Sequence, residues 1–539
     1  MSVASVILAS LLLAIPATLA LAAIICGLPV TRLALSESQR WRVAWRAVQL
    51  VAVLVGALVI LSLQHLNAPL LWLSDDPLRL TLLALLSVMA LVLVHFSRRY
   101  MAADPGFGRY FRWLLFTLAA VSLVFVSNHL LIFWLAWVAI SLALHQLLMF
   151  YPERPRAALA AHKKFILARL AELSLLAAFL LLWHQHGNAE ISSIINTYQQ
   201  PLPLSFNEQL AAVLLALTAL IKCAQLPVHG WLIKVVEAPT PVSALLHAGV
   251  INLGGFLLLL FSPLFLQVAA AQWLVLVVAG LTTLLAALIM ATRISVKVRL
   301  AWSTSAQMGL MLMQCALGLV ELALLHLLAH SGYKAWAFLS SGSAVREHLQ
   351  QSMLRSKTPG AKEWSVATLI AALLMLVGIG LTSLLISTPQ PLSSWLLLGM
   401  AMTVLLAQPS EHQGWLRPLM LALLLVLAYG LLKALMQSLT ADLNPVLRPQ
   451  PLSAADLWAG VVFIGLFASW WVLRHCGHWP VVQRISVALF AGLYLDEWFT
   501  RITLKIWPAR IPKRIHAKQP PLSLSRPTVT LKSRKELPL

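Results

Sequence analysis

The sequence predicts an all-α protein that crosses a membrane about 14 or 15 times. Three observations lead to this fold class. Of the 539 residues, 60% are hydrophobic and only 11% are charged, with a mean hydropathy of +0.85, which excludes an ordinary soluble protein. Apolar runs of about 20 residues recur along the chain, which is typical of spanning helices and not of a β-barrel. Basic residues gather in alternate connections, as they do in polytopic membrane proteins.

The apolar runs give the positions of the predicted spans. The first run is too long for a cleavable signal peptide and lacks its basic start, so we expect a retained helix. Proline, glycine and charged residues mark most of the boundaries between runs. The predicted spans cover residues 5–28, 47–66, 78–97, 113–127, 129–150, 165–183, 209–227, 241–261, 272–291, 300–320, 322–341, 364–387, 394–408, 417–437 and 457–474.

The net charge of +21 follows the connections between spans and forms no nucleic-acid footprint. Arginine and lysine follow the first, third, fifth, ninth and eleventh spans, and the intervening connections carry acidic residues or almost no charge. The positive-inside rule therefore predicts that the N-terminus lies outside and the basic tail lies in the cytoplasm. We expect the tail, residues 484–539, to lie on the lipid surface or to be disordered.

One stretch, residues 220–255, combines charge with helix breakers. Lys222 ends an apolar run and Pro227 follows five residues later, so the helix should break just beyond the lysine. A second apolar helix, opened by Pro239 and Pro241, carries His247. Ionisable groups inside spans are costly and commonly mark an ion or proton path. The structural alternative is a lysine that snorkels to the interface and a histidine with one buried hydrogen bond.

Two spans carry further titratable groups. Arg169 and Glu172 lie three residues apart on the sixth span and can form an ion pair on one helix face, which could also be purely structural. His326, His330 and Lys334 recur every four residues on the eleventh span, so they form a ridge along one face. Such a ridge is how a proton relay through a membrane would be built.

Two other lysines are weaker candidates for the path. Lys297 precedes a polar helix start that could be hydrated, and Lys433 is a lone lysine within the fourteenth span, where snorkelling explains it nearly as well. The four cysteines show no spacing typical of disulfides or of a zinc site. We therefore expect no metal and no cofactor in this chain.

Several motifs resemble the antiporter-like subunits of respiratory complex I and of multisubunit cation/proton antiporters. They are residues 222–227 (KCAQLP), 237–247 (EAPTPVSALLH) and 297–309, together with the pair on the sixth span and the ridge on the eleventh. The resemblance covers most of residues 100–345. It implies two inverted repeats with broken helices. It also implies a proton path through Lys222, Glu172, His247, His326, His330, Lys334, Lys297 and Arg169, with Lys433 as an open case.

The chain departs from this family at one position. The family's fifth helix carries a glutamate that pairs with the lysine, whereas Trp137 occupies that place here, so Glu172 is the candidate partner of Lys222. Residues 235–241 and 247–255 look most like the DabB-like membrane subunit of the two-component DAB inorganic-carbon pumps. That resemblance implies a large cytoplasmic, zinc-bearing partner similar to a carbonic anhydrase (DabA-like).

The sequence thus predicts a proton-conducting, non-enzymatic subunit of an inorganic-carbon pump in the cytoplasmic (inner) membrane. Two rivals stay open: a cation/proton antiporter or complex I-type pump subunit, and a purely structural membrane anchor for a soluble enzyme. Four regions are expected, namely N-terminal spans (1–110), the antiporter-like core (111–345), C-terminal spans (346–483) and the tail (484–539).

Overall fold

A computed structural model describes residues 3–28, 35–62, 72–201, 203–353, 359–385, 391–407, 416–440 and 451–507. Within these residues the regular secondary structure is helical, apart from two isolated bridges, Leu73 with Ser127 and His129 with Glu190. Eleven of the described helical segments are long and apolar enough to cross a membrane. The predicted all-α, polytopic fold is confirmed.

The first half of the chain supplies α1 to α12. Their bounds are α1 (Val3–Gly27), α2 (Glu37–Ser62), α3 (Pro77–Tyr100), α4 (Phe107–Val126), α5 (Leu130–Leu148), α6 (Pro155–His186), α7 (Ile191–Thr197), α8 (Phe206–Lys222), α9 (Gly230–Lys234), η1 (Val235–Glu237), α10 (Thr240–Ala248), η2 (Val250–Asn252), α11 (Leu253–Leu260) and α12 (Ser262–Phe265).

The second half supplies α13 to α22. Their bounds are α13 (Ala269–Ala291), α14 (Val296–Ala316), α15 (Val320–Leu339), η3 (Ser341–Ser343), α16 (Ala344–Met353), α17 (Ala361–Leu385), α18 (Leu392–Leu406), α19 (Leu416–Leu439), α20 (Ala454–His475), α21 (Pro480–Phe490), η5 (Gly492–Tyr494) and α22 (Glu497–Ile506). Each predicted span overlaps a helix or, for residues 241–261, the consecutive segments α10, η2 and α11; the span predicted at 209–227 is shorter, because α8 ends at Lys222.

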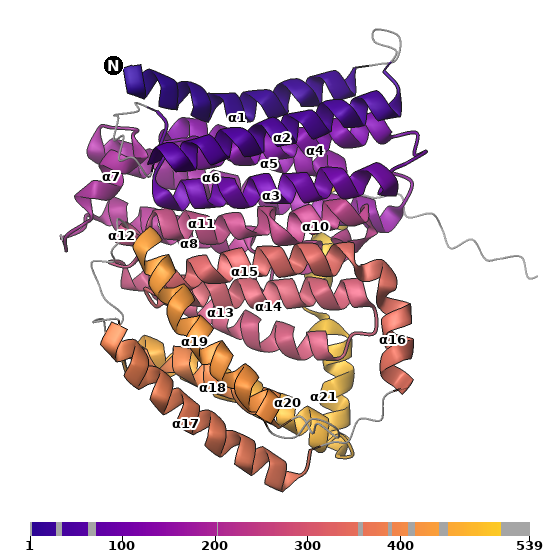
Figure 1. The fold of residues 1–539 in the computed structure, drawn as a ribbon, viewed down its shortest axis with the longest axis vertical. Coiled ribbons are helices and arrows are strands. Elements are labelled where there is room, and N and C mark those ends of the chain that lie inside the picture. Colours follow the sequence, from indigo (N-terminus) through magenta and orange to yellow (C-terminus); the bar gives the residue numbers. More distant parts are fainter. Residues whose placement is uncertain are drawn as a thin grey trace, which may run out of the picture.

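The long helices lie side by side and run roughly across the view in Figure 1, with α1 at one edge of the bundle and α17 at the other. The α1–α6 stack lies next to the core formed by α8–α15, and α17–α20 form a smaller group beside α13. Short α7 lies at one end of this bundle and α16 lies at the other, so we call these the α7 end and the α16 end. One face of each outer helix stays apolar and exposed, for example Leu369, Leu373 and Leu376 on α17, as expected for a surface that meets lipid.

Two helices begin about ten residues earlier than the hydropathy pattern predicts. Helix α2 starts at Glu37 and helix α6 starts at Pro155, which occupies the first-turn position where proline is tolerated. The predicted span 165–183 leaves Lys163 and Lys164 in the preceding connection, and this is wrong, because α6 includes both and buries them inside the bundle. A hydropathy pattern ends a predicted span at a lysine, even where the helix continues through that residue.

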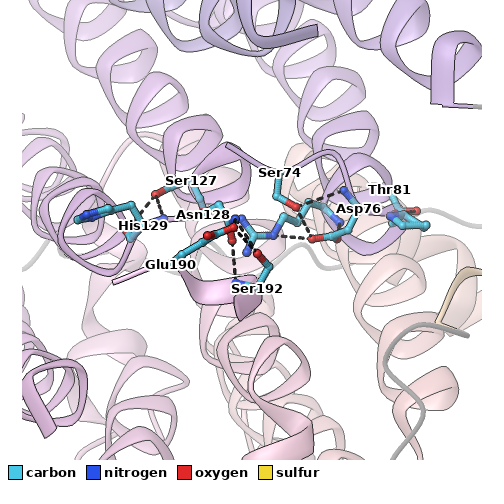
Figure 2. A network of polar contacts seen from close by, with 10 residues as sticks. Ser74, Asp76, Thr81, Ser127, Asn128, His129, Glu190 and Ser192 are labelled. Carbon is cyan, nitrogen blue, oxygen red and sulfur yellow. Dashed lines mark hydrogen bonds and ion pairs between the residues drawn. The ribbon is translucent and has the colours of Figure 1, made fainter. Parts of the chain in front are cut away.

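A polar network closes the α7 end (Figure 2). The side chain of Asn128, in the α4–α5 connection, donates to Glu190 at 3.1 Å and to Ser192 at 2.8 Å. Asp76 caps α3 by accepting from the backbone N–H of Arg79 at 2.9 Å. The side chain of Arg79 is 1% exposed and pairs with the Asp76 carboxylate at 2.7 Å. Arg79 also donates to the Ser127 carbonyl, so the network joins the start of α3 to the α4–α5 connection and, through Asn128, to the start of α7.

Candidate functional site

The sequence of α8 itself determines where this helix starts and where it ends. A capping box starts the helix, since Ser205 accepts from the Glu208 N–H and the Glu208 side chain accepts from the Ser205 N–H at 2.7 Å. The helix ends at Lys222, before Pro227, as predicted. Neighbouring helices satisfy backbone groups freed by the break: Ser305 donates to the Ala224 carbonyl at 2.9 Å, for example. A non-helical segment is thus tolerated at membrane depth because protein groups surround it.

Lys222 projects from the last turn of α8 towards an aromatic ring. Its Nζ lies 4.6 Å from the centre of the Trp137 ring, which is 1% exposed. A cation over an indole face is attracted by the ring quadrupole, although less strongly than by a carboxylate in contact. Among the described residues, no carboxylate oxygen lies within 4.0 Å of Lys222 Nζ. Trp137 therefore does occupy the place beside this lysine.

Glu172 faces the same region but is paired with an arginine. Arg169 NH2 lies 2.7 Å from one carboxylate oxygen and 2.9 Å from the other. Ser141, on α5, donates to the same carboxylate at 2.5 Å. Glu172 is 4% exposed, whereas the Arg169 side chain is 32% exposed, so the pair joins the interior to the helix surface. The i, i+3 pair expected from the sequence thus forms.

A small cavity connects Lys222 with Glu172. It has a volume of about 30 Å³, and its lining includes Lys222, Glu172, Lys164, Trp137 and Trp231. A water molecule requires about 10–15 Å³ measured in this way, together with polar partners, so the cavity has room for bridging water. Lys222 and Glu172 therefore face a shared space without touching.

Lys164 is a member of this site that the sequence analysis missed. Its side chain is buried, and its Nζ donates to the Ser141 carbonyl at 2.6 Å while lining the cavity. The sequence does indicate that Lys164 lies beside Glu172, since Lys164, Ala168 and Glu172 are spaced four residues apart and so share one face of α6. Pro155, as a helix start, would have extended the helix far enough to include the lysine.

A second group of polar residues gathers where α10, α14 and α15 meet. His247 Nδ1 lies 3.1 Å from Thr304 Oγ1, and its ring stacks on Phe338 with 4.4 Å between the ring centres. Nε2 of His247 has no hydrogen-bond partner among the described residues. Helix α10 gives way to η2 just after this histidine, and Asn252 at the end of η2 donates to Ser331 of α15 at 2.7 Å.

The ridge on α15 forms as the spacing predicts. Lys334 Nζ donates to Ser303 Oγ at 2.7 Å and is fully buried. The rings of His330 and His326 lie 6.1 Å apart between centres. His326 bonds Gln314 at 3.0 Å and Gln307 at 2.9 Å, whereas neither ring nitrogen of His330 has a partner in the described part of the chain. The ridge thus contains one imidazole whose nitrogens are free to exchange a proton.

The two weaker lysine candidates lie on the flanks of this second group. Lys297, at the start of α14, donates to Thr240 Oγ1 at 2.8 Å, at the α16 end of the bundle. Lys433 on α19 is 1% exposed, and its Nζ lies 3.4 Å from Glu321, in the first turn of α15. Glu321 was not predicted, because nothing in the sequence relates it to a lysine more than a hundred residues away.

The structure thus brings most of the candidate residues into two groups. The first group surrounds Lys222 on α5, α6 and α8, and the second surrounds His247 and Lys334 on α10, α14 and α15. Within the described residues, no direct hydrogen bond joins Lys222 to His247. Within the described residues, no set of three or more His, Cys, Asp or Glu side chains could hold a metal ion.

Comparison with known proteins gives consistent results. A family model described as NADH:quinone oxidoreductase/Mrp antiporter, TM matches residues 127–410, more than half of the chain. The chain is 44% identical to the probable inorganic carbon transporter subunit DabB of Hydrogenovibrio crunogenus, over 83% of this chain and 86% of that protein. It is 36% identical to the probable inorganic carbon transporter subunit DabB2 of Halothiobacillus neapolitanus, over 95% and 97%. The resemblance predicted from the motifs is confirmed.

A solved structure supports the fold. The Mrp complex from a Dietzia species contains a chain that superposes with a TM-score of 0.60 at 20% sequence identity. The match covers 92% of this chain and 60% of that one, so the present chain spans about three fifths of its length. At this identity the likeness concerns the arrangement of the helices alone.

Proposed function

The chain belongs to the DabB family of inorganic carbon transporter subunits, within the NADH:quinone oxidoreductase/Mrp antiporter transmembrane family, and on this premise we propose that it conducts protons for an inorganic-carbon pump. The pump lies in the cytoplasmic (inner) membrane. Proton flow through this chain drives the accumulation of bicarbonate by a partner. The chain itself carries no catalytic site and no cofactor.

One observation carries the proposal: titratable groups line the interior of the bundle at two places that packing alone does not explain. Lys222 opens onto a cavity shared with Glu172 and Lys164. Lys334 lies one helical turn from His330, whose ring nitrogens have no hydrogen-bond partner in the part of the chain that the structure describes. An ionisable side chain inside a membrane costs about 3 kcal/mol or more, so several of them in register point to ion or proton movement. A bundle interior that served only to pack the helices would contain none of these ionisable side chains.

The proposed path uses the residues in spatial order. Water in the cavity links Glu172 and Lys164 to Lys222, and movement of Lys222 away from the acid favours the release of its proton. His247 and Lys334 continue the path, and His330 and His326 carry it towards the α7 end. Arg169 and Lys297 supply fixed positive charge beside the two groups. Lys433, with Glu321, lies at the α7 end of this path.

The proposed partner is a large cytoplasmic subunit similar to a carbonic anhydrase, with zinc at its own site. Zinc there would activate water for attack on carbon dioxide. The first experiment is to purify the tagged chain gently from membranes, identify the proteins that accompany it and assay zinc. One large soluble zinc protein supports the proposal. Several small membrane subunits, or flavin and iron–sulfur proteins, contradict it.

The proton path is tested by Lys222→Ala and His330→Ala. We expect each variant to lose uncoupler-sensitive bicarbonate uptake while the chain still reaches the membrane and retains its partner. Lys362→Ala and His478→Ala are matched controls, because both side chains are exposed and lie outside the two groups. Normal uptake in both test variants would show that the path does not pass through these residues, and would favour a structural anchor.

A cation/proton antiporter is the second candidate, favoured by the family model and the Mrp fold. The replacement of the family's fifth-helix glutamate by Trp137 argues against it. Proteoliposomes containing the purified complex distinguish the two. Sodium-dependent proton exchange without bicarbonate would favour the antiporter, and its absence together with carbon-dependent uptake would favour the pump.

A further inference from the structure

The C-terminal helices fold back onto the broken helix. After α20 the chain forms α21, which runs at a steep angle to the stacked helices near the α16 end, and then α22. Helix α22 packs against α6 through the buried Phe499 and Thr503, and Trp507 stacks on His162 of α6 with 4.1 Å between the ring centres. Asp496 to Trp507 therefore form an ordered arm on the core, which we call the latch.

The latch places the carboxylate of Asp496 in contact with two lysines, Lys163 and Lys234. The two Asp496 oxygens lie 2.6 Å and 2.7 Å from Lys163 Nζ, and one lies 2.8 Å from Lys234 Nζ. Thr500 Oγ1 lies 2.6 Å from Lys163 Nζ. The Lys163 side chain is 0% exposed, whereas those of Asp496 and Lys234 are 22% and 35% exposed. Burial raises the pKa of the Asp496 carboxyl, but the bonds and charges of Lys163 and Lys234 hold it below its ordinary value.

The broken helix is shaped to receive this carboxylate. Gly230, the first residue of α9, lies against Asp496, and a methyl group at this position would overlap the carboxylate. Lys234 ends α9, so the acid meets both ends of this short helix. Without the acid, Lys163 would be a buried cation with no counter-ion, an arrangement that proteins avoid.

The position of the cluster connects it to the cavity beside Lys222. Lys163 is followed directly by Lys164, which lines that cavity, and Trp231 of α9 lines the same cavity. The acid thus bonds to both α6 and α9, and each of these helices contributes residues to the cavity lining. Separation of Asp496 from either lysine would free α9 to move relative to α6.

We propose that the latch closes the α16 end of the Lys222 cavity by holding α9 against α6, with Asp496 as its positioning residue. The inference rests on the proposed proton path and adds a means of controlling when protons enter that path. With the latch seated, protons reach Lys222 only when the coupled reaction displaces α9. With the latch released, the cavity opens to water at that end and protons leak through.

The test uses the purified complex in proteoliposomes, with a pH-sensitive dye inside and no inorganic carbon supplied. For Asp496→Asn we expect proton leak to rise about five-fold or more, the lower range of typical coupling between sites, while bicarbonate uptake falls. Glu497→Gln is the matched control, because this neighbouring acid is exposed and, among the described residues, its one ion pair is the exposed contact with Arg501 at 3.8 Å. Hydrogen exchange of residues 497–506 reports release of the latch directly.

Further variants separate the latch from a structural role. Gly230→Ala keeps every charge but displaces the carboxylate, so it should leak as Asp496→Asn does. If Asp496→Asn does not accumulate, Thr500→Val replaces it as the test variant. Wild-type leak in both Gly230→Ala and the tested latch variant, or a loss of proton flux in place of a leak, overturns the latch. Adding Lys222→Ala should stop the leak; a leak that persists refutes the path through Lys222 and leaves the latch standing.

Discussion

Lys222 and Lys334 are the central cations of the two groups, and their surroundings differ. Lys222 is partly buried, faces Trp137 and shares a cavity with Glu172 and Lys164. Lys334 is fully buried and bonds the Ser303 hydroxyl, with no carboxylate within 4.0 Å among the described residues. A nearby acid can stabilise the charged form of Lys222, whereas only dipoles and water can do so for Lys334. The two lysines should therefore hold their protons with different strength.

The largest effect should come from preventing either lysine from releasing a proton. Arginine keeps the positive charge but is not deprotonated in proteins. We expect Lys222→Arg and Lys334→Arg each to lower proton-driven bicarbonate uptake roughly 10²-fold, the lower range for loss of a proton-transfer group. Uptake by membrane vesicles after an imposed pH step measures this, with the exposed Lys362→Arg as control. Near-normal uptake in Lys334→Arg alone would mean that only Lys222 titrates.

An intermediate effect should follow from removing the acid on the Lys222 side. Glu172→Gln keeps the hydrogen-bonding shape but deletes the charge that faces the cavity, so we expect uptake to fall about ten-fold, less than for either lysine. The loss should affect the first group only, because Lys334 has no such acid. The exposed Glu153→Gln is the control. Combining Glu172→Gln with Lys222→Arg should cost little more than Lys222→Arg alone if the two residues act as a unit.

The sequence predicts the groups better than it predicts their partners. Proline placement located the break after Lys222, and four-residue spacing located the His326 ridge, because both are local properties of a helix. The replacement of the family's glutamate by Trp137 was also visible. Lys164 was missed because a hydropathy window ends a span at a lysine, even though α6 continues through it. The contacts of Asp496 with Lys163 and of Glu321 with Lys433 join distant parts of the chain, so only packing reveals them.

The smallest functional effect should come from the pair at the α7 end. Lys433 is almost fully buried and has Glu321 at 3.4 Å, so removing the acid alone leaves a buried cation without a partner. Breaking a buried pair can cost about 3–5 kcal/mol, although a lysine can limit this by losing its proton. We expect Glu321→Gln to lower the melting temperature of the purified chain more than Glu321→Gln combined with Lys433→Met, which removes both charges.

Uptake in this double variant decides the role of the pair. If the pair only holds α15 to α19, the double variant should recover stability and retain uptake within about two-fold of the wild type, as expected for a change outside the path. If uptake stays low although stability recovers, the pair conducts protons at the α7 end. That result would supply the second group with the carboxylate that Lys334 lacks, and the two regions would then differ in where the acid lies and not in whether one is present.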